Sequence, residues 1–411
     1  MLIKRKLLDD LRKHLSQKEM SLIVGARQVG KTTIMNELKS ILEKKGERTL
    51  FLNLDFEEDK KFFNSQLNLV KRIELEFGKK SGYVFIDEIQ RKENAGIFLK
   101  GIYDRNLPYK FIVSGSGSLE LKEKIHESLA GRKRMFELQP VSFWEFADFK
   151  TNYRYENRLN DFFGLDKEQA LSFLKEYMKF GGYPRVVVEG ALDEKRKIIG
   201  EIFRSYLEKD ISYLLKVEKV DAFSQMIRLL AAQVGNLVNY SELSSALNVS
   251  LPTVKNYLWY ARKTFVLNLL PPYFRNKRKE VVKSPMVYFN DLGLRNYAIG
   301  LFGQELEFGN SGFVFQNFIF NLLREKFDEN NELRFWRTKD GAEVDFVLSS
   351  DKDILPIEVK YKELNEPTAE HSLRSFIEKY RPREAWIINL TLEKEIKIHG
   401  ASVRFLPFFK L

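Results

Sequence analysis

The feature that most constrains this chain is the segment 25–32, Gly-Ala-Arg-Gln-Val-Gly-Lys-Thr, which has the form G-x-x-x-x-G-K-[ST]. An apolar run at 21–24 precedes it, and apolar residues at helical spacing follow it over 32–44. Strand, glycine loop and helix together cradle phosphate, because backbone N–H groups and a helix N-terminus converge on the phosphate oxygens. In this context Lys31 reaches the β- and γ-phosphates and the Thr32 hydroxyl binds Mg²⁺. The predicted ATP-binding residues are Gly25, Ala26, Arg27, Gln28, Val29, Gly30, Lys31, Thr32 and Thr33.

Composition narrows the remaining possibilities. The 411 residues are enough for several domains. The absence of cysteine excludes disulfides, thiol nucleophiles and Cys-based zinc sites. The net charge of +11 suits an anionic partner such as nucleic acid. No apolar stretch approaches the ~18 residues that span a bilayer, and the N-terminal residues lack a signal-peptide pattern. We therefore expect a soluble, cytoplasmic protein without a membrane partner.

Two acidic residues follow a second apolar run. Residues 83–86 read Tyr-Val-Phe-Ile, and Asp87 and Glu88 come directly after them. A buried parallel strand delivers such carboxylates to the edge of the sheet where ligands bind. We expect Asp87 to hold Mg²⁺ and Glu88 to polarise the attacking water. The alternative is a strand that simply exits into an acidic turn.

Two further segments extend the predicted site. The run 111–113 leads into Ser-Gly-Ser-Gly-Ser, where the hydroxyl of Ser114 or Ser116 is placed to bond the γ-phosphate or the attacking water. Arg132 and Arg134 stand before a β-like run at 135–138. An arginine at such a position can complete the catalytic site of a neighbouring subunit. The alternative is a solvated basic turn.

Together these strings resemble the AAA+ ATPases of the P-loop class. More narrowly, they resemble a bacterial and archaeal family that joins this ATPase to a C-terminal domain of unassigned function. The resemblance covers nearly the whole chain, and its strings are residues 25–33, 87–90, 114–116, 129–132, 140–143, 181–184 and 206–211. It implies an ATPase core at 1–150, a helical lid at 151–215 and a homo-oligomer, hexameric by analogy. Arg185 of the lid is a candidate nucleotide sensor, although a structural arginine is the favoured interpretation.

Residues 216–304 have the pattern of a winged helix. A short helix at 240–247 is followed by a turn and by a helix at 251–263 with Pro252 in its first turn, and two β-like runs follow at 265–270 and 286–289. Residues 251–283 hold eight Lys or Arg and one Glu, a charge that attracts DNA phosphates. Protein binding is the alternative. The candidate DNA contacts are Thr253, Lys255 and Asn256 on the helix and Arg275, Lys277, Arg278 and Lys279 in the connection.

Residues 305–411 resemble the PD-(D/E)XK nucleases. Asp345 lies in an alternating run, and Glu358 and Lys360 share one face of the next run. In such nucleases the acids hold Mg²⁺ and the lysine activates the attacking water. The expected helix at 312–327 has Gln316 where the family pattern has Glu. Because one charged ligand is lost, we expect a domain that does not cleave.

The sequence thus predicts an α/β protein: a P-loop AAA+ parallel sheet with a helical lid, followed by a winged helix-turn-helix and an α/β PD-(D/E)XK nuclease-like domain. It would hydrolyse ATP with Mg²⁺ to remodel or move along DNA. Two alternatives stay open. One is a nucleotide-controlled switch whose winged helix binds protein, and the other is an ATP-gated, metal-dependent nuclease. Salt-dependent DNA binding would distinguish the DNA-acting ATPase from the protein-binding switch. Metal-dependent DNA cleavage would identify the nuclease.

Overall fold

The computed structural model describes residues 2–78, 80–116, 129–214, 219–273, 284–305, 308–327, 331–350 and 353–411. A five-stranded sheet in the order β2-β3-β4-β1-β5 forms the N-terminal lobe, and all its strands are parallel. The interior strand β1, which lies between β4 and β5, is buried along its whole length, as expected for a parallel strand covered on both faces. The strands are β1 (Met20–Gly25), β2 (Thr49–Asn53), β3 (Gly82–Asp87), β4 (Tyr109–Ser116) and β5 (Lys133–Glu137).

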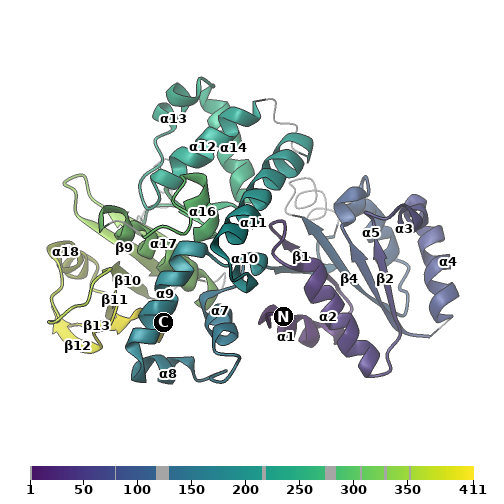
Figure 1. The fold of residues 1–411 in the computed structure, drawn as a ribbon, viewed down its shortest axis with the longest axis horizontal. Helices are drawn as coiled ribbons and strands as arrows, with labels where there is room; N and C mark the ends of the chain where they lie inside the picture. The colour runs from purple at the N-terminus through teal and green to yellow at the C-terminus, as the bar shows by residue number, and fades with distance from the viewer. Residues whose placement is uncertain are drawn as a thin grey trace.

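Helices cover both faces of this sheet (Figure 1). α1 and α2 lie on one side, and α4 and α5 lie on the other. The predicted strand, loop and helix over 21–44 are confirmed, because β1 leads directly through the loop into α2. The helices are α1 (Leu7–Lys13), α2 (Lys31–Lys44), α3 (Glu57–Lys60), α4 (Gln66–Phe77) and α5 (Ala95–Tyr103), with short 3-10 segments η1 (His14–Ser16), η2 (Lys61–Asn64) and η3 (Ile89–Arg91).

A helical region occupies the centre of the molecule (Figure 1). It begins at Ser142, whose side chain and Glu145 form a reciprocal cap on the first helix. Gly182 lies so close to the N-terminal lobe that a Cβ there would meet the Val141 oxygen at 2.1 Å, so only glycine fits. The helices are α7 (Phe143–Lys150), α8 (Leu159–Leu165), α9 (Lys167–Phe180), α10 (Pro184–Val188), α11 (Leu192–Ser205) and a π-helix, η4 (Tyr206–Leu214).

Three helices and a β-hairpin, which together we call the hairpin module, follow the helical region in the chain. They are α12 (Val220–Ala232), α13 (Tyr240–Leu247), α14 (Leu251–Lys263), β6 (Leu267–Leu270) and β7 (Met286–Phe289), and α16 (Leu292–Ala298) follows. β6 and β7 pair antiparallel, with Leu267 opposite Phe289. The expected strand at 265–270 begins two residues late, because Phe265 has a φ of 62° and its N–H bonds the Arg262 oxygen. Left-handed backbone cannot continue a strand.

The C-terminal lobe is a mixed six-stranded sheet in the order β12-β13-β11-β10-β9-β8. β11 pairs parallel with both β10 and β13, and the other pairs are antiparallel. Two helices pack on this sheet, so the α/β fold class is confirmed. Its elements are α17 (Phe308–Lys326), β8 (Glu332–Arg337), β9 (Glu343–Ser349), β10 (Ile354–Val359), α18 (His371–Tyr380), β11 (Glu384–Asn389), β12 (Lys394–Ile398), β13 (Ala401–Pro407) and η5 (Phe408–Lys410).

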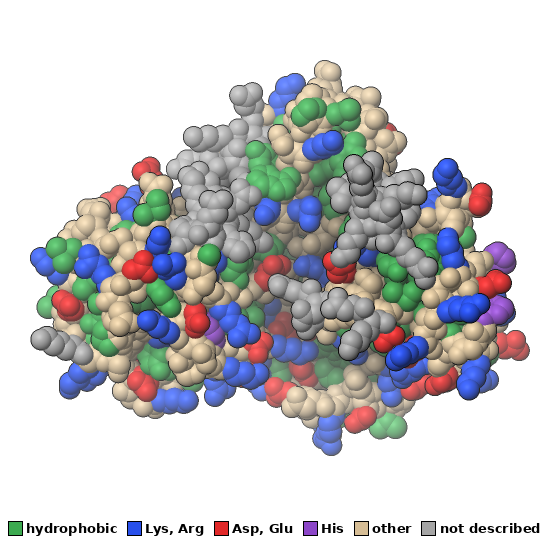
Figure 2. All heavy atoms as spheres, turned by 180° about the vertical axis from the view of Figure 1, so that it is seen from behind, with side chains coloured by type: hydrophobic (Ala, Val, Ile, Leu, Met, Phe, Trp, Pro, Cys, Tyr) green, Lys and Arg blue, Asp and Glu red, His purple; other side chains and the backbone are tan. Residues whose placement is uncertain are grey.

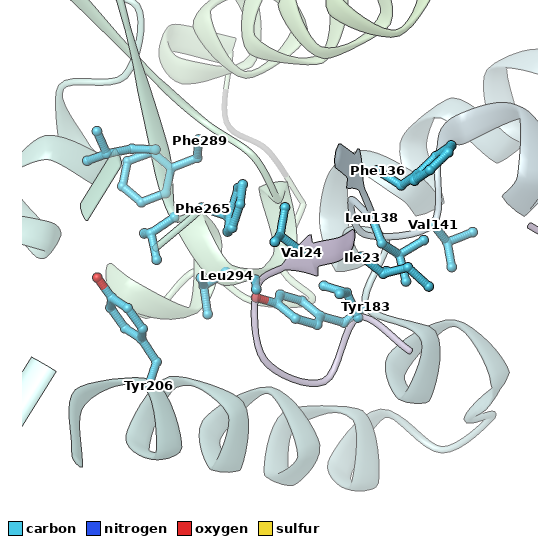
Figure 3. Close-up of a cluster of buried hydrophobic side chains, with 14 of the residues drawn as sticks. Ile23, Val24, Phe136, Leu138, Val141, Tyr183, Tyr206, Phe265, Phe289 and Leu294 are labelled. Carbon is cyan, nitrogen blue, oxygen red and sulfur yellow. The ribbon is translucent and has the colours of Figure 1, made fainter. Parts of the chain in front are cut away.

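One hydrophobic core runs through the lobes. Figure 3 shows Val24 of β1 beside side chains of the helical region and of the hairpin module. Tyr183 and Tyr206 contribute from the helical region, and Phe265 and Phe289 contribute from the hairpin module. The strand that precedes the glycine loop therefore shares its packing with elements that lie almost 270 residues further along the chain.

Candidate nucleotide site

The glycine loop lies between the carboxyl end of β1 and the first turn of α2. Gly30 has a φ of +100° and Gln28 a φ of 60°, so the loop uses left-handed backbone at two positions. A Cβ at Gly25 would meet the Leu138 oxygen at 2.3 Å. α2 starts at Lys31 directly after Gly30. The loop N–H groups and the N-terminus of a 14-residue helix are thus brought together as the phosphate-binding prediction requires.

Lys31 is held by the loop that carries it. Its ammonium donates to the Ala26 oxygen at 2.8 Å and to the Gly25 oxygen at 3.1 Å. Burial lowers the pKa of Lys31, and the carboxylates of Glu88 and Asp210 oppose that fall. Phosphate oxygens are charged acceptors and would bind this ammonium more strongly than neutral carbonyl groups.

Asp87 joins three elements of the sheet edge. The side chain is fully buried at the end of β3. One carboxylate oxygen accepts a hydrogen bond from the Thr32 hydroxyl at 2.7 Å, and the other accepts one from the Ser114 hydroxyl. A carboxylate and a hydroxyl are oxygen donors of the kind that Mg²⁺ prefers. Thr32 and Asp87 therefore fit the predicted metal site.

Glu88 occupies an unusual backbone position beside this cluster. Its φ is 57°, and its N–H donates to the Ser114 hydroxyl at 3.3 Å. Non-glycine residues held in this region carry strain and concentrate at functional sites. The Gln90 side chain donates to the Glu88 carboxylate. Of the two candidate serines, Ser114 lies at the site, and the side chain of Ser116 lies outside the described part of the structure.

Residues of the helical region contact the glycine loop directly. Arg185 donates to the Gln28 side chain at 3.1 Å and also approaches Glu201 at 3.3 Å. Arg27 forms an ion pair with Asp210 of η4, with 2.8 Å between Nε and Oδ1. Sequence reasoning did not identify Asp210, although the string 206–211 that contains it belongs to the resemblance.

Arg5 bonds the glycine loop through its guanidinium group. The sequence did not indicate this contact either. Its guanidinium donates to the Val29 oxygen at 2.9 Å and to the Gln139 oxygen at 2.6 Å, and it pairs with Glu145 at 3.0 Å. These partners come from three separate segments. No local pattern around Arg5 signals this role.

Arg132 and Arg134, the two candidates for completing a neighbouring site, lie far from the chain's own glycine loop. The Arg132 oxygen accepts from the Met20 N–H, which places it at the amino end of β1, whereas the glycine loop follows the carboxyl end. Arg132 pairs with Asp104 at 2.8 Å. The Arg134 guanidinium lies 5.7 Å from the ring centroid of Phe136.

The predicted acids of the C-terminal lobe bind donors of their own chain. The Asp345 carboxylate accepts from the Gln316 amide and from the Val359 N–H, both at 2.7 Å. Enclosure of this carboxyl raises the pKa of Asp345 to about 7. Lys360 pairs with Glu358 at 2.6 Å and with Glu370 at 2.5 Å. Within the described ranges, no three His, Asp or Glu side chains are placed to share a metal ion.

The helix-borne candidates for DNA contact lie on α14. Ser250 caps the helix, and its hydroxyl bonds the Thr253 hydroxyl at 2.8 Å. Lys255 and Asn256 are exposed. No helix in the described part of the chain is long and apolar enough to cross a bilayer. The connection candidates Arg275, Lys277, Arg278 and Lys279 lie outside the described residues.

Comparison with protein families separates the chain into three matched segments. Residues 17–147 match the AAA domain family. Residues 172–305 match a Domain of unknown function (DUF8612), and residues 311–409 match a second, DUF4143. The first segment contains the five-stranded sheet and the glycine loop, so the N-terminal lobe is the part of the chain that is similar to the AAA domain family.

Relatives occur in archaea and bacteria. An uncharacterized protein of Methanocaldococcus jannaschii is 26% identical over 375 residues, which cover 89% of this chain and 80% of the relative. One from Haemophilus influenzae is 26% identical over 356 residues, with coverage of 84% and 82%. Among solved structures, the Aeropyrum pernix ORC1 protein in complex with DNA overlaps with a TM-score of 0.31 at 14% identity, covering 72% of this chain and 92% of that one. The replication initiator DnaA bound to AMPPCP and single-stranded DNA overlaps with a TM-score of 0.33 at 14% identity, covering 64% and 90%.

Proposed function

We propose that this protein is an ATPase of the AAA class that uses Mg²⁺ and acts on DNA. The observation that carries the ATPase proposal is the cluster in which Asp87 binds both Thr32 and Ser114 beside a glycine loop. These three residues come from three different elements, yet their side chains meet at one sheet edge. That convergence supports a phosphoryl-transfer site, because positioning and charge stabilisation are the main demands of this chemistry.

Each side chain has a role in this proposal. Bound ATP and Mg²⁺ supply the transferable phosphoryl group and the charge that stabilises it. Lys31 would leave the loop carbonyls for the phosphate oxygens, and Thr32 and Asp87 would hold the ion. Glu88 accepts the proton of the attacking water, and Ser114 orients that water or the terminal phosphate.

The DNA proposal is supported by the arrangement of α12, α13, α14 and the β6–β7 hairpin. A short helix, a tight turn at Asn248 and a second helix have the order expected of a helix-turn-helix, and the hairpin that follows supports the winged-helix interpretation. Lys255 and Asn256 are exposed on the second helix, where they can enter a groove. On the face drawn in Figure 2, Lys and Arg side chains are spread among Asp and Glu side chains. The face drawn in Figure 2 is therefore not proposed as a large basic surface for DNA.

We also propose that subunits assemble into a ring in which Arg132 or Arg134 completes the site of a neighbour. The support is geometric. Both arginines lie at the amino ends of the strands, and the glycine loop lies at the carboxyl ends, so neither serves its own site. A hexamer is the assembly that the resemblance implies.

The C-terminal lobe is proposed to be nuclease-like in fold and inactive in cleavage. The order α17, β8, β9, β10, α18, β11 places a helix before a three-stranded meander and a helix after it, which supports the nuclease-like interpretation. Its acids are bonded to Gln316, to a backbone N–H and to Lys360, which supports the absence of catalysis.

The test of the proposed function is the steady-state rate of ATP hydrolysis, measured alone and with single-stranded, duplex or branched DNA. The proposal predicts Mg²⁺-dependent turnover that DNA stimulates. Turnover without any response to DNA, and without salt-dependent DNA binding, would favour a nucleotide-controlled switch that binds protein. Metal-dependent cleavage of the branched DNA would favour the ATP-gated nuclease.

A further inference from the structure

The π-helix η4 connects the glycine loop to α14. It spans Tyr206–Leu214, and it follows α11 without a break. π-helical turns are rare, and they appear mostly at functional sites. Two side chains of η4, Tyr206 and Asp210, face two different parts of the molecule.

Asp210 lies against the glycine loop. Its carboxylate pairs with Arg27 at 2.8 Å, and the two side chains are only 5% and 16% exposed. Burial raises the pKa of Asp210, and the charges of Arg27 and Lys31 oppose that rise. Asp210 therefore shares the electrostatic surroundings of Lys31, the residue expected to bind the phosphates.

Tyr206 lies one turn earlier and bonds the end of α14. Its hydroxyl is 3.0 Å from the Thr264 hydroxyl, and Thr264 is the C-cap residue of α14. The Tyr206 ring also lies 6.1 Å from the ring of Phe223 on α12. In Figure 3 Tyr206 projects from its helix into the buried cluster that contains Phe265 and Phe289. A movement of η4 would therefore act on α12 and on α14.

The triphosphate of ATP conflicts with the ion pair in two ways. Its negative charges compete with Asp210 for Arg27, because phosphate is a strong bidentate acceptor for a guanidinium group. They also repel the Asp210 carboxylate, since like charges are destabilised where water is excluded. A ligand shifts a protein toward the state that binds it better. Bound ATP thus favours a state in which Asp210 has left Arg27.

We propose that the Arg27–Asp210 pair is an autoinhibitory contact that ATP displaces, and that η4 transmits this displacement to α14 through Tyr206. The inference rests on the proposed function, in that the glycine loop must bind ATP. It names the regulation of that site and its route to the candidate DNA-binding helix. Coupling between two sites is reciprocal, so a ligand that pulls α14 away from η4 strengthens ATP binding by the same factor.

The first test measures the dissociation constants of Mg²⁺ with a fluorescent ATP analogue and of AMP. Asp210→Asn removes the competing charge, so its affinity for the ATP analogue should rise roughly fivefold or more. Its affinity for AMP should change less, since AMP lacks the β- and γ-phosphates. Glu208→Gln is the matched control, because it neutralises an exposed acid on the same helix and should leave both constants unchanged.

The second test measures hydrogen exchange in proteins whose Arg27–Asp210 ion pair is not mutated. Hydrogen exchange of the amides in 206–214 and 251–263 should increase in the wild type when ATP and Mg²⁺ are added. Tyr206→Phe should keep the response of 206–214 and lose that of 251–263.

The outcomes separate the two proposals. The autoinhibitory contact alone would be overturned if the wild type binds ATP and Asp210→Asn binds it with equal or lower affinity. It would also be overturned if ATP leaves hydrogen exchange at 206–214 unchanged. If neither the wild type nor Asp210→Asn binds ATP, the proposed function and this inference both fail.

Discussion

The two lobes treat buried carboxylates in opposite ways. At the N-terminal site, Asp87 is bonded to two hydroxyl groups, which are neutral and can turn toward a metal ion or a phosphate. At the C-terminal site, Asp345 is fixed by an amide and a backbone N–H, and Glu358 is neutralised by Lys360. Acids at strand ends are therefore insufficient to indicate a metal site. The donors that surround them decide whether the chain has left them for a ligand.

The largest effect that would test this contrast is loss of nucleotide binding in Lys31→Ala. The variant removes the ammonium that now lies on the loop carbonyls and should meet the phosphates. We expect no measurable binding of ATP by calorimetry under conditions where the wild type saturates. Lys39→Ala is the control, because Lys39 lies on the same helix and pairs with Glu43. Wild-type affinity in Lys31→Ala would show that the loop is not the phosphate site.

The substitution Gln316→Glu should make the C-terminal site resemble a metal site, because it removes the amide that donates to Asp345. The substitution replaces the amide donor of Asp345 with a second acid, so it should destabilise the lobe by about 1–3 kcal/mol. Added Mg²⁺ should restore part of the lost stability, because the ion can now bind two carboxylates. Thermal melts with and without Mg²⁺, in the absence of nucleotide, measure this. A wild-type melt that shifts equally with Mg²⁺ would contradict the proposal that this lobe has lost the metal site of a nuclease.

A smaller effect is expected in the pH dependence of stability. The pKa of Asp345 is raised to about 7 from the ordinary 3.8, so the folded lobe binds this proton more tightly than the unfolded chain. The stability that Asp345 contributes is complete below pH 4 and is lost as the pH rises to about 7. Compared with the wild type, Asp345→Asn should therefore gain in relative stability between pH 4 and pH 7. Urea denaturation at both pH values checks this, and parallel pH profiles would contradict it.

The smallest predicted effects concern DNA contact by α14 and by the connection that holds residues 277–279. Lys255→Ala removes one exposed charge, so the log–log slope of DNA affinity against salt should fall by about one unit. The triple change of Lys277, Arg278 and Lys279 to Glu should lower it by about three units. Affinity should fall alike for different sequences, because phosphate contacts do not read bases. An unchanged slope in both variants would remove this module from the DNA interface.

Much of the nucleotide site could be predicted from the sequence because its signals are local. The loop 25–32, the two acids at the end of β3 and the serine near the end of β4 each follow an apolar run, and parallel strands bring their carboxyl ends to one edge. The contacts of Arg5 and Asp210 could not be predicted in this way. Asp210 lies 183 residues from Arg27, and a single long-range ion pair leaves no periodic pattern.

In the C-terminal lobe, the strands that carry Asp345 and Glu358 could be predicted from the sequence, but the partners of the lobe's polar side chains could not. The alternating runs and the departure at Gln316 were visible, and the structure adds that this amide bonds Asp345. α17 begins at Phe308, four residues before the expected start at Gly312. Lys360 was expected to serve a water molecule, but it bridges Glu358 and Glu370, and the second partner lies at the cap of α18.

The central claim is that ATP is hydrolysed at the N-terminal site and that the C-terminal acids take no part. Its most direct test is the rate of ATP hydrolysis by the wild type, Glu88→Gln and Asp345→Asn, measured side by side with Mg²⁺. The account predicts that Glu88→Gln binds ATP but loses roughly 10²- to 10⁴-fold in turnover, because the water loses its base. Asp345→Asn should match the wild type. Wild-type turnover in Glu88→Gln, or loss of turnover in Asp345→Asn, would contradict the account.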